Sequence, residues 1–222
     1  MKIIINLFFI SIIFLINYSN SEEVKDYKKL YSIKNSNINF LHDVEIFNLD
    51  GSINAVVEIP SGSIEKWKLN SKGDAIELTL KNNSLRKIDY IGYPTNYGFI
   101  PKTLLPFKID GDGDAVDVLI LGNQLSIGQI VRCRVLGMLE MNDKSLIDNK
   151  IICVEKDSYL GRANSIKDLE KLAPRALKII EIWFTNYKGE KIEILGMSKK
   201  KKTIKFIEDA NKYYLDNIAN KQ

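Results

Sequence analysis

The sequence predicts an α+β fold whose core is a small β-barrel. Two observations favour this class: short segments with strand-like alternation follow one another between residues 55 and 154, and helical periodicity begins only after them. The chain has 222 residues, of which 45% are hydrophobic, so it can bury one substantial core. No internal repeat or linker divides it, and we expect residues 22–222 to form a single domain.

The first 21 residues are predicted to be a signal peptide that does not belong to the fold. Lys2 supplies a positive charge, residues 3–16 are almost wholly apolar, and Ser19 and Ser21 are small residues suited to a cleavage site. The apolar run is shorter than the roughly 20 residues of a membrane span. We expect an exported protein, periplasmic or secreted, without stable membrane insertion after cleavage. An uncleaved membrane anchor and a cytoplasmic location are the alternatives.

Six segments are predicted as strands. Pro60 ends the first, and alternation of apolar and polar side chains marks the second and third. The strands cover residues 55–59, 65–69, 75–80, 118–121, 129–138 and 150–154. The intervening segments are expected to be an irregular lead-in with a short helix at 22–50, a rigid loop at 93–101 and a polar loop at 140–149.

The C-terminal part is predicted to be mainly helical. Ser165 and Asp168 form a capping pattern at the start of the first helix, and Pro174 interrupts and restarts it. Residues 190–196 could form a short strand. Apolar residues at helical spacing then predict a second, amphipathic helix over residues 204–214.

Composition limits the partners and the chemistry. The net charge of +4 is too small to demand a nucleic-acid partner, and the lysine run at 199–202 is expected to be a solvated stretch beside a helix. Cys133 and Cys153 lie in apolar strand segments, where buried thiols are usual, although export would permit a disulfide. The single histidine, His42, lies in a polar region without an evident role, so the chemistry does not depend on histidine.

Residues 110–117 hold four aspartates and lead directly into an apolar strand. Carboxylates this close repel one another unless a cation lies between them, and hard divalent cations such as Mg²⁺, Mn²⁺ or Ca²⁺ take oxygen ligands. A solvated acidic turn would explain the same run. An EF-hand is excluded because Ala115 and Leu121 occupy the positions of its required glycine and glutamate. A structural Ca²⁺ loop of another kind remains open.

Nearby segments carry groups that suit a phosphate substrate. A site built from carboxylates alone favours Mg²⁺-type phosphoryl chemistry over zinc hydrolysis. Phosphate oxygens also need cations and hydrogen-bond donors. Such groups are Lys66, Arg86, Tyr93, Tyr97, Lys150, Tyr187 and Lys188, and a second acidic pair is Asp143 and Asp148. The residues therefore indicate a site for polyphosphate and metal.

The run DGDAVDV at residues 112–118 resembles the signature of soluble family I inorganic pyrophosphatases, D-(S/G/D/N)-D-(P/E)-hydrophobic-D-hydrophobic. Further landmarks of that family follow in matching order between about residues 55 and 189: Glu58, Lys66, Arg86, Tyr93, Tyr97, Asp143, Asp148, Lys150, Tyr187 and Lys188. The resemblance implies an OB-like five-stranded β-barrel flanked by two C-terminal helices. It also implies Mg²⁺-dependent hydrolysis of inorganic pyrophosphate to two orthophosphates by a metal-bridged hydroxide.

The resemblance further implies a role for each site residue. Asp112, Asp117 and Asp148 would bind the principal metals, with Asp117 bridging two of them and taking part in catalysis, and Asp143 would hold metal that arrives with the substrate. Asp114 would be the general base. The phosphates would be bound by Lys66, Arg86, Tyr97, Lys150, Tyr187 and Lys188, with Glu58 and Tyr93 in support. Several Mg²⁺ ions are expected per site, with Mn²⁺ or Zn²⁺ as substitutes. The expected assembly is a homo-oligomer, a hexamer if the protein is of the bacterial type.

Three positions depart from the family pattern. Ala115 stands where proline or glutamate is expected, Lys68 where many members carry glutamate, and Lys144 where an acid is common. The two lysines put auxiliary metal sites in doubt but leave the central aspartates intact, so activity is expected. The alternatives are an inactive phosphate- or metal-binding relative and a non-catalytic OB-type module for nucleic acid. Five aspartates would oppose a nucleic-acid backbone, so we expect no such partner.

Overall fold

The computed structural model describes residues 31–35, 37–82, 84–106, 111, 113–144, 146–188 and 192–217. The predicted signal peptide at residues 1–21 and the predicted metal ligand Asp112 lie outside these ranges. Within the described ranges, no helix combines the length and apolar character needed to cross a membrane.

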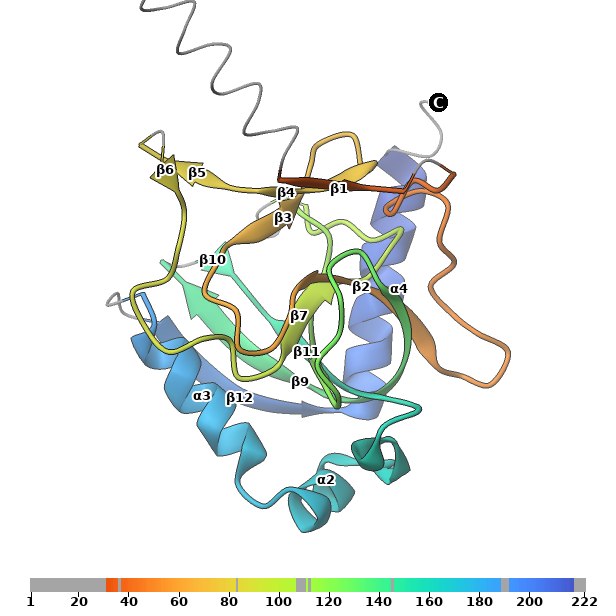
Figure 1. The fold of residues 1–222 in the computed structure, drawn as a ribbon. Coiled ribbons are helices and arrows are strands. Elements are labelled where there is room, and N and C mark those ends of the chain that lie inside the picture. Colours follow the sequence, from red (N-terminus) through yellow and green to blue (C-terminus); the bar gives the residue numbers. More distant parts are fainter. Residues whose placement is uncertain are drawn as a thin grey trace, which may run out of the picture.

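Five strands close into a barrel (Figure 1). In the order of their pairing they are β2 (Ile53–Ile59), β7 (Asn96–Phe99), β8 (Asp117–Leu121), β11 (Lys150–Glu155) and β9 (Ile130–Asp143). β2 also pairs with β9, and this pairing closes the circuit. Only the β8–β11 pair among these five is parallel. The predicted α+β fold with an OB-like five-stranded barrel is confirmed.

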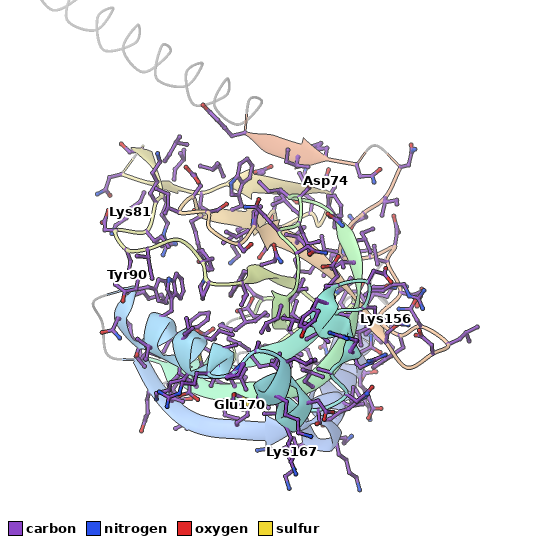
Figure 2. The ribbon with its side chains drawn as sticks, turned by 60° about the horizontal axis from the view of Figure 1, so that its bottom comes forward. Asp74, Lys81, Tyr90, Lys156, Lys167 and Glu170 are labelled. Carbon is purple, nitrogen blue, oxygen red and sulfur yellow. The ribbon has the colours of Figure 1, made fainter. Side chains whose placement is uncertain are left out.

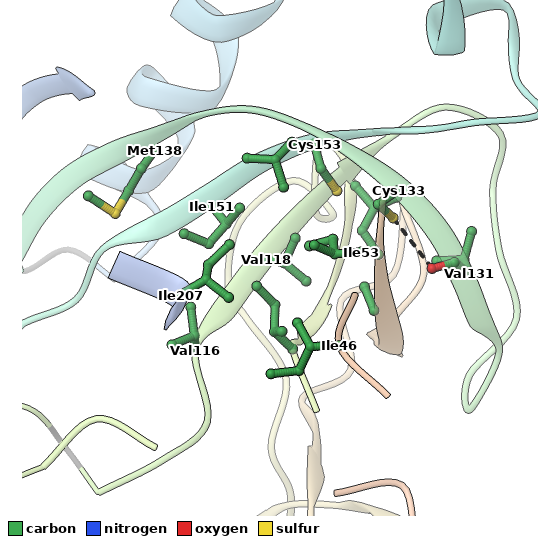
Figure 3. Close-up of a cluster of buried hydrophobic side chains, with 14 of the residues drawn as sticks. Ile46, Ile53, Val116, Val118, Val131, Cys133, Met138, Ile151, Cys153 and Ile207 are labelled. Atoms are coloured by element: carbon green, nitrogen blue, oxygen red, sulfur yellow. Dashed lines mark hydrogen bonds between the residues drawn. The ribbon is translucent and has the colours of Figure 1, made fainter. Parts of the chain in front are cut away.

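Apolar side chains from facing strands fill the barrel. Ile53, Val118, Cys133, Ile151 and Cys153 belong to one buried cluster (Figure 3). Gly98 allows β7 to approach β2 closely, because a Cβ at this position would lie 2.0 Å from the carbonyl oxygen of Val56. Both cysteines are buried and free, so the structure contains the buried thiols expected from their apolar surroundings and no disulfide between them.

The predicted polar loop at residues 140–149 is wrong. β9 continues to Asp143 and turns back into the short strand β10 (Leu146–Ile147). The far edge of this extension pairs with β12 (Ile192–Lys199), which is longer than the strand predicted at 190–196. Backbone groups that a loop would leave to water are therefore satisfied by neighbouring strands.

A small second sheet, in the order β1-β4-β3, packs against the barrel strands β2 and β7. Its strands are β1 (Ser32–Lys34), β4 (Ala75–Leu78) and β3 (Trp67–Leu69), and a hairpin of β5 (Leu80–Lys81) and β6 (Ser84–Leu85) follows. The strands predicted at 65–69 and 75–80 are thus present in shorter form. The lead-in forms β1 and turns, and its described part contains no helix. The predicted loop at 93–101 contains β7.

The helices follow the predicted order. α2 (Ile166–Leu172) begins at Ser165, whose Oγ accepts a hydrogen bond from the backbone N–H of Asp168, so the predicted cap is confirmed. The chain breaks at Pro174 and continues as α3 (Ala176–Asn186). The helix α4 (Lys200–Asn217) packs on β9 and β12. A short 3₁₀ helix, η2 (Tyr159–Arg162), precedes α2.

The outer surfaces of these elements carry the charged side chains. Lys167 and Glu170 on α2 lie on the outside of the molecule (Figure 2). The lysine run at 199–202 ends β12 and opens α4 with exposed side chains, which confirms that it is a solvated stretch. His42 donates or accepts a 2.5 Å hydrogen bond at the hydroxyl of Tyr214, and so has a structural partner on α4.

Candidate active site

A pocket of about 570 Å³ lies where β3 faces the barrel strands. Nearly all of the predicted site residues that the structure describes line it: Glu58, Lys66, Arg86, Tyr97, Asp114, Asp117, Asp143, Asp148, Lys150, Tyr187 and Lys188. Tyr93 lies behind them. The fold thus brings together residues that are separated by up to 130 positions, from 58 to 188.

Lys150 at the start of β11 lies at the centre of the carboxylates. Its side chain is 2% exposed, and its Nζ donates hydrogen bonds to Asp117 Oδ2 at 2.5 Å and to Asp148 Oδ1. Burial alone would lower the pKa of Lys150, but the two carboxylates outweigh burial and raise it. Burial raises the pKa of Asp148, with Lys150 opposing and Asp117 reinforcing the rise. The lysine compensates one of the two negative charges.

Asp143 at the end of β9 pairs with Lys188, which follows α3. The pair fixes only one oxygen of the carboxylate. The other, Oδ1, is buried and has no hydrogen-bond partner among the described residues. Buried carboxylate oxygens normally have a partner, so this atom is available to a ligand or cation in the pocket.

Tyrosines surround the ammonium of Lys66. Its Nζ donates a hydrogen bond to the hydroxyl of Tyr93 at 2.8 Å and lies 5.0 Å from the ring centroid of Tyr97. Burial lowers the pKa of Lys66. Tyr93 is 2% exposed and packs against Trp183 and Tyr187, which places it behind the pocket as a support for Lys66.

Glu58 near the end of β2 connects the barrel to β3. Its Oε1 accepts a hydrogen bond from the backbone N–H of Leu69 at 2.6 Å, and its side chain is buried. Burial raises the pKa of Glu58 to about 7, while the hydrogen bond from Leu69 opposes the rise. The carboxyl therefore holds β3 against the end of β2, and its supporting role at the site stays a prediction.

Asp114 lies in the bend that precedes β8, and Asp117 is the first residue of that strand. Gly113 adopts φ of +79°, a left-handed conformation that glycine accepts without strain. The N–H of Gly113 and the carbonyl of Asp114 both bond to the backbone of Leu105, so the bend is fixed. It brings Asp114 and Asp117 to the same pocket although they are three residues apart.

Lys68 also lines the pocket, and sequence reasoning identified it only as a departure from the family pattern. Its Nζ lies 2.6 Å from Asp114 Oδ2. The signal that could have assigned it to the site is its spacing from Lys66, because side chains two residues apart share one face of an extended strand. Arg86 reaches the pocket as an exposed side chain.

The donor set suits a hard divalent cation. Among the described residues no three carboxylate, histidine or cysteine groups are already arranged as a metal cluster. Asp117 and Asp148 nevertheless converge on one ammonium, and Asp143 adds the buried oxygen without a partner. The residues that line the pocket include no histidine and no cysteine, and oxygen ligands alone favour Mg²⁺ over zinc.

An OB-like barrel with lysines, an arginine and tyrosines around a group of carboxylates defines a site for metal-assisted chemistry on a small, highly charged phosphate compound. The family model described as inorganic pyrophosphatase matches residues 55–215. The chain therefore belongs to the inorganic pyrophosphatase family.

Relatives and solved structures agree with this assignment. The chain is 32% identical to the inorganic pyrophosphatase of Campylobacter jejuni over 179 residues, which cover 78% of this chain and 98% of the relative. It is 39% identical to that of Neisseria meningitidis serogroup B over 142 residues, 64% of this chain and 74% of the relative.

Two type I inorganic pyrophosphatase structures share its fold. That of Toxoplasma gondii matches with a TM-score of 0.74 and 26% identity, over 81% of this chain and 88% of the other. That of Plasmodium falciparum matches with a TM-score of 0.74 and 29% identity, over 81% of this chain and 64% of the other. A binding module for nucleic acid is not favoured by any of these similarities.

Proposed function

We propose that this protein is an inorganic diphosphatase that hydrolyses pyrophosphate to two orthophosphates with the help of a divalent cation. The observation that carries the proposal is the single pocket in which four aspartates and five cationic side chains meet: Asp114, Asp117, Asp143 and Asp148 with Lys66, Lys68, Arg86, Lys150 and Lys188. Membership of the inorganic pyrophosphatase family supports the choice of substrate.

Cationic and phenolic groups of the pocket bind the two phosphate groups. Pyrophosphate carries several negative charges in a small volume, and charge-assisted hydrogen bonds are the strongest contacts that side chains can offer it. Lys66, Arg86, Lys150 and Lys188 supply the charge, and Tyr97 and Tyr187 supply hydroxyl donors. These groups also neutralise the charge that develops on the leaving phosphate.

Asp114 acts as the general base. The oxygen of a water molecule attacks one phosphorus atom, the bond from that phosphorus to the bridging oxygen breaks, and its electron pair stays on the leaving phosphate. The proton of the water passes to the Asp114 carboxylate. The side chain is suited to this because it lies at the accessible rim of the pocket, 45% exposed, close to the more buried aspartates.

The predicted ligands of the principal metals are Asp112, Asp117 and Asp148, and Asp143 is predicted to hold metal that arrives with the substrate. A bound divalent cation would activate water and neutralise phosphate charge. We propose Mg²⁺ as the physiological ion, several per site, with Mn²⁺ or Zn²⁺ as substitutes. The carboxylate-only donor set and the unpartnered oxygen of Asp143 support this choice.

An assay of phosphate release tests the function. Purified protein with pyrophosphate and Mg²⁺ should release two phosphates per substrate between about pH 6 and pH 9, and excess EDTA should abolish the release. Asp117→Ala should lose turnover, whereas a binding module would keep its affinity for nucleic acid after the same change. No phosphate release by the unmodified protein across this range would refute the proposal.

We further propose that the protein is exported through residues 1–21 and works as a homo-oligomer, a hexamer if it is of the bacterial type. The apolar N-terminal run and its small flanking residues support export. N-terminal sequencing of protein from fractionated cells should give a start at Glu22. A start at Met1 would leave the uncleaved anchor or the cytoplasm as the location. Sedimentation of the purified protein tests the assembly.

A further inference from the structure

The pair of Lys68 and Asp114 differs from the other ion pairs of the pocket in its exposure. Nζ of Lys68 lies 2.6 Å from Asp114 Oδ2, and the two side chains are 51% and 45% exposed. Lys150 is 2% exposed and Lys188 is 26% exposed in their own pairs with aspartates. An exposed pair contributes little to stability, so the contact of Lys68 with Asp114 costs less to break than the more buried contacts of the other two lysines.

The backbone around Lys68 is held firmly although its side chain is accessible. The next residue, Leu69, donates its N–H to buried Glu58. Lys66 donates its N–H to the carbonyl of Arg86 and accepts from the N–H of Thr79, both at 2.9 Å. Trp67, which lies between the two lysines in the sequence, packs against two clusters of buried hydrophobic side chains. Lys66 and Lys68 therefore present their ammonium groups to the pocket from a fixed strand.

Asp114 has a task that competes with this pairing. A general base must offer a lone pair to the attacking water, and in the structure one of its oxygens already accepts from Lys68. The four-carbon stem of lysine is flexible and its ammonium is a compact charge, so a short movement brings it to an anionic substrate in the same pocket.

We propose that Lys68 is a further substrate-binding residue, whose ammonium pairs with Asp114 in the free protein and moves to a phosphate oxygen when pyrophosphate binds. The movement ends the contact between Lys68 and Asp114, so the ammonium of Lys68 no longer competes with the attacking water for Oδ2 of Asp114. This inference rests on the proposed function, because it takes Asp114 as the base. The positive charge that Lys68 offers to the phosphate belongs to a side chain and is therefore present without a bound metal.

Affinity for imidodiphosphate, a pyrophosphate analogue with a bridging nitrogen, measures the proposed contact. Calorimetric titrations would compare the unmodified protein with Lys68→Met and Lys68→Arg, once in EDTA and once in Mg²⁺. Lys34→Met is the matched control, because Lys34 is an exposed lysine of the same small sheet, paired with Asp74 at 3.1 Å outside the pocket. Loss of one charged hydrogen bond should weaken binding about tenfold in Lys68→Met.

The variants should distinguish the loss of a contact with the substrate from a general disturbance of the pocket. Lys68→Arg keeps the charge and should retain most of the affinity, and Lys34→Met should bind like the unmodified protein. In the pyrophosphatase assay, Lys68→Met should raise KM with little loss of kcat, because Lys68 binds the substrate and takes no part in the transfer of the proton to Asp114. Disturbance of the pocket by a merely structural residue would lower kcat as well.

An affinity of Lys68→Met equal to that of the unmodified protein in both conditions would overturn the role of Lys68. That result, with normal phosphate release, would leave the proposed function intact. Weaker analogue binding by Lys68→Met in a protein that releases no phosphate would keep Lys68 as an anion-binding residue and remove the enzymatic function instead.

Discussion

Buried Lys150 and half-buried Asp117 form an ion pair at the centre of the pocket, with 2.5 Å between Nζ and Oδ2. Asp148 shares the same ammonium. One positive charge therefore serves two carboxylates that lie within reach of each other. These three side chains together carry one excess negative charge, which attracts a divalent cation. The lysine also holds both carboxylates in place before the cation binds.

Removal of Lys150 should make the unfolding free energy of the protein depend on whether Mg²⁺ is present. Lys150→Met removes the buried ammonium that two partly buried neighbouring carboxylates share. Breaking a buried pair by removal of one partner costs about 3–5 kcal/mol of unfolding free energy. Mg²⁺ should restore part of this loss, because it binds the folded carboxylates. Urea denaturation in EDTA and in Mg²⁺ measures both effects.

The same change at an exposed lysine is the control. Lys178 on α3 pairs with Glu181 at 3.0 Å and is 66% exposed, so Lys178→Met should alter stability little in either condition. If Lys150→Met lost no more unfolding free energy than Lys178→Met in EDTA, the pairs of Lys150 with the two aspartates would not stabilise the folded protein.

The base can be tested by a change of one atom. Asp114→Asn keeps the size of the side chain but removes the carboxylate that accepts the proton. We expect kcat for pyrophosphate hydrolysis to fall about 10²–10⁴-fold, the usual contribution of a general base. Asp74→Asn serves as the control, because Asp74 pairs with Lys34 outside the pocket and should leave kcat unchanged. A decrease below threefold at Asp114 would assign the proton to another group.

Local patterns were sufficient to predict most of the strands and helices, and non-local pairing was not. Pro60 marked the end of β2, alternation identified β3 and β4, and the cap at Ser165 marked the start of α2. The extension of β9 past residue 139 was missed because its polar residues resemble a loop. The short β10 pairs with the last two of them, and along the other edge they pair with β12, some fifty residues later. No local signal contains that partner.

The site shows the same division. The signature run identified Asp114 and Asp117. The further family landmarks identified the predicted phosphate-binding side chains that line the pocket. The sharing of Lys150 between two aspartates depends on the parallel register of β8 and β11, which the sequence does not display. Asp112 remains a prediction, since it lies outside the described residues. The pairing of Lys68 with Asp114 joins residues 46 positions apart, so it could not be predicted from the sequence.

The two cysteines provide a test of the barrel interior. Cys133 and Cys153 have no exposed surface, and burial raises the pKa of Cys153 well above its usual range. Both conditions suppress reaction with thiol reagents, which attack the exposed thiolate. We expect no reaction of Ellman's reagent with the native protein and two thiols per chain after unfolding without reductant. Fewer than two thiols after unfolding would reveal a disulfide.

Glu58 should make the stability of the metal-free protein depend on pH. Burial raises its pKa to about 7 from 4.5, so the folded protein binds more protons than the unfolded chain between these values. The contribution of Glu58 to stability is therefore complete below pH 4.5 and is lost as the pH rises through 7. The shift corresponds to roughly 3 kcal/mol.

The substitution Glu58→Gln isolates this contribution, because glutamine does not titrate and keeps an oxygen that can accept from the N–H of Leu69. Other groups titrate in both proteins and cancel in the difference. The unfolding free energy of the unmodified protein minus that of Glu58→Gln should decrease steadily from pH 5 to pH 8 in EDTA. A difference that stays constant, or increases, over this range would show that Glu58 is already ionised at pH 5 and that its burial does not hold the proton.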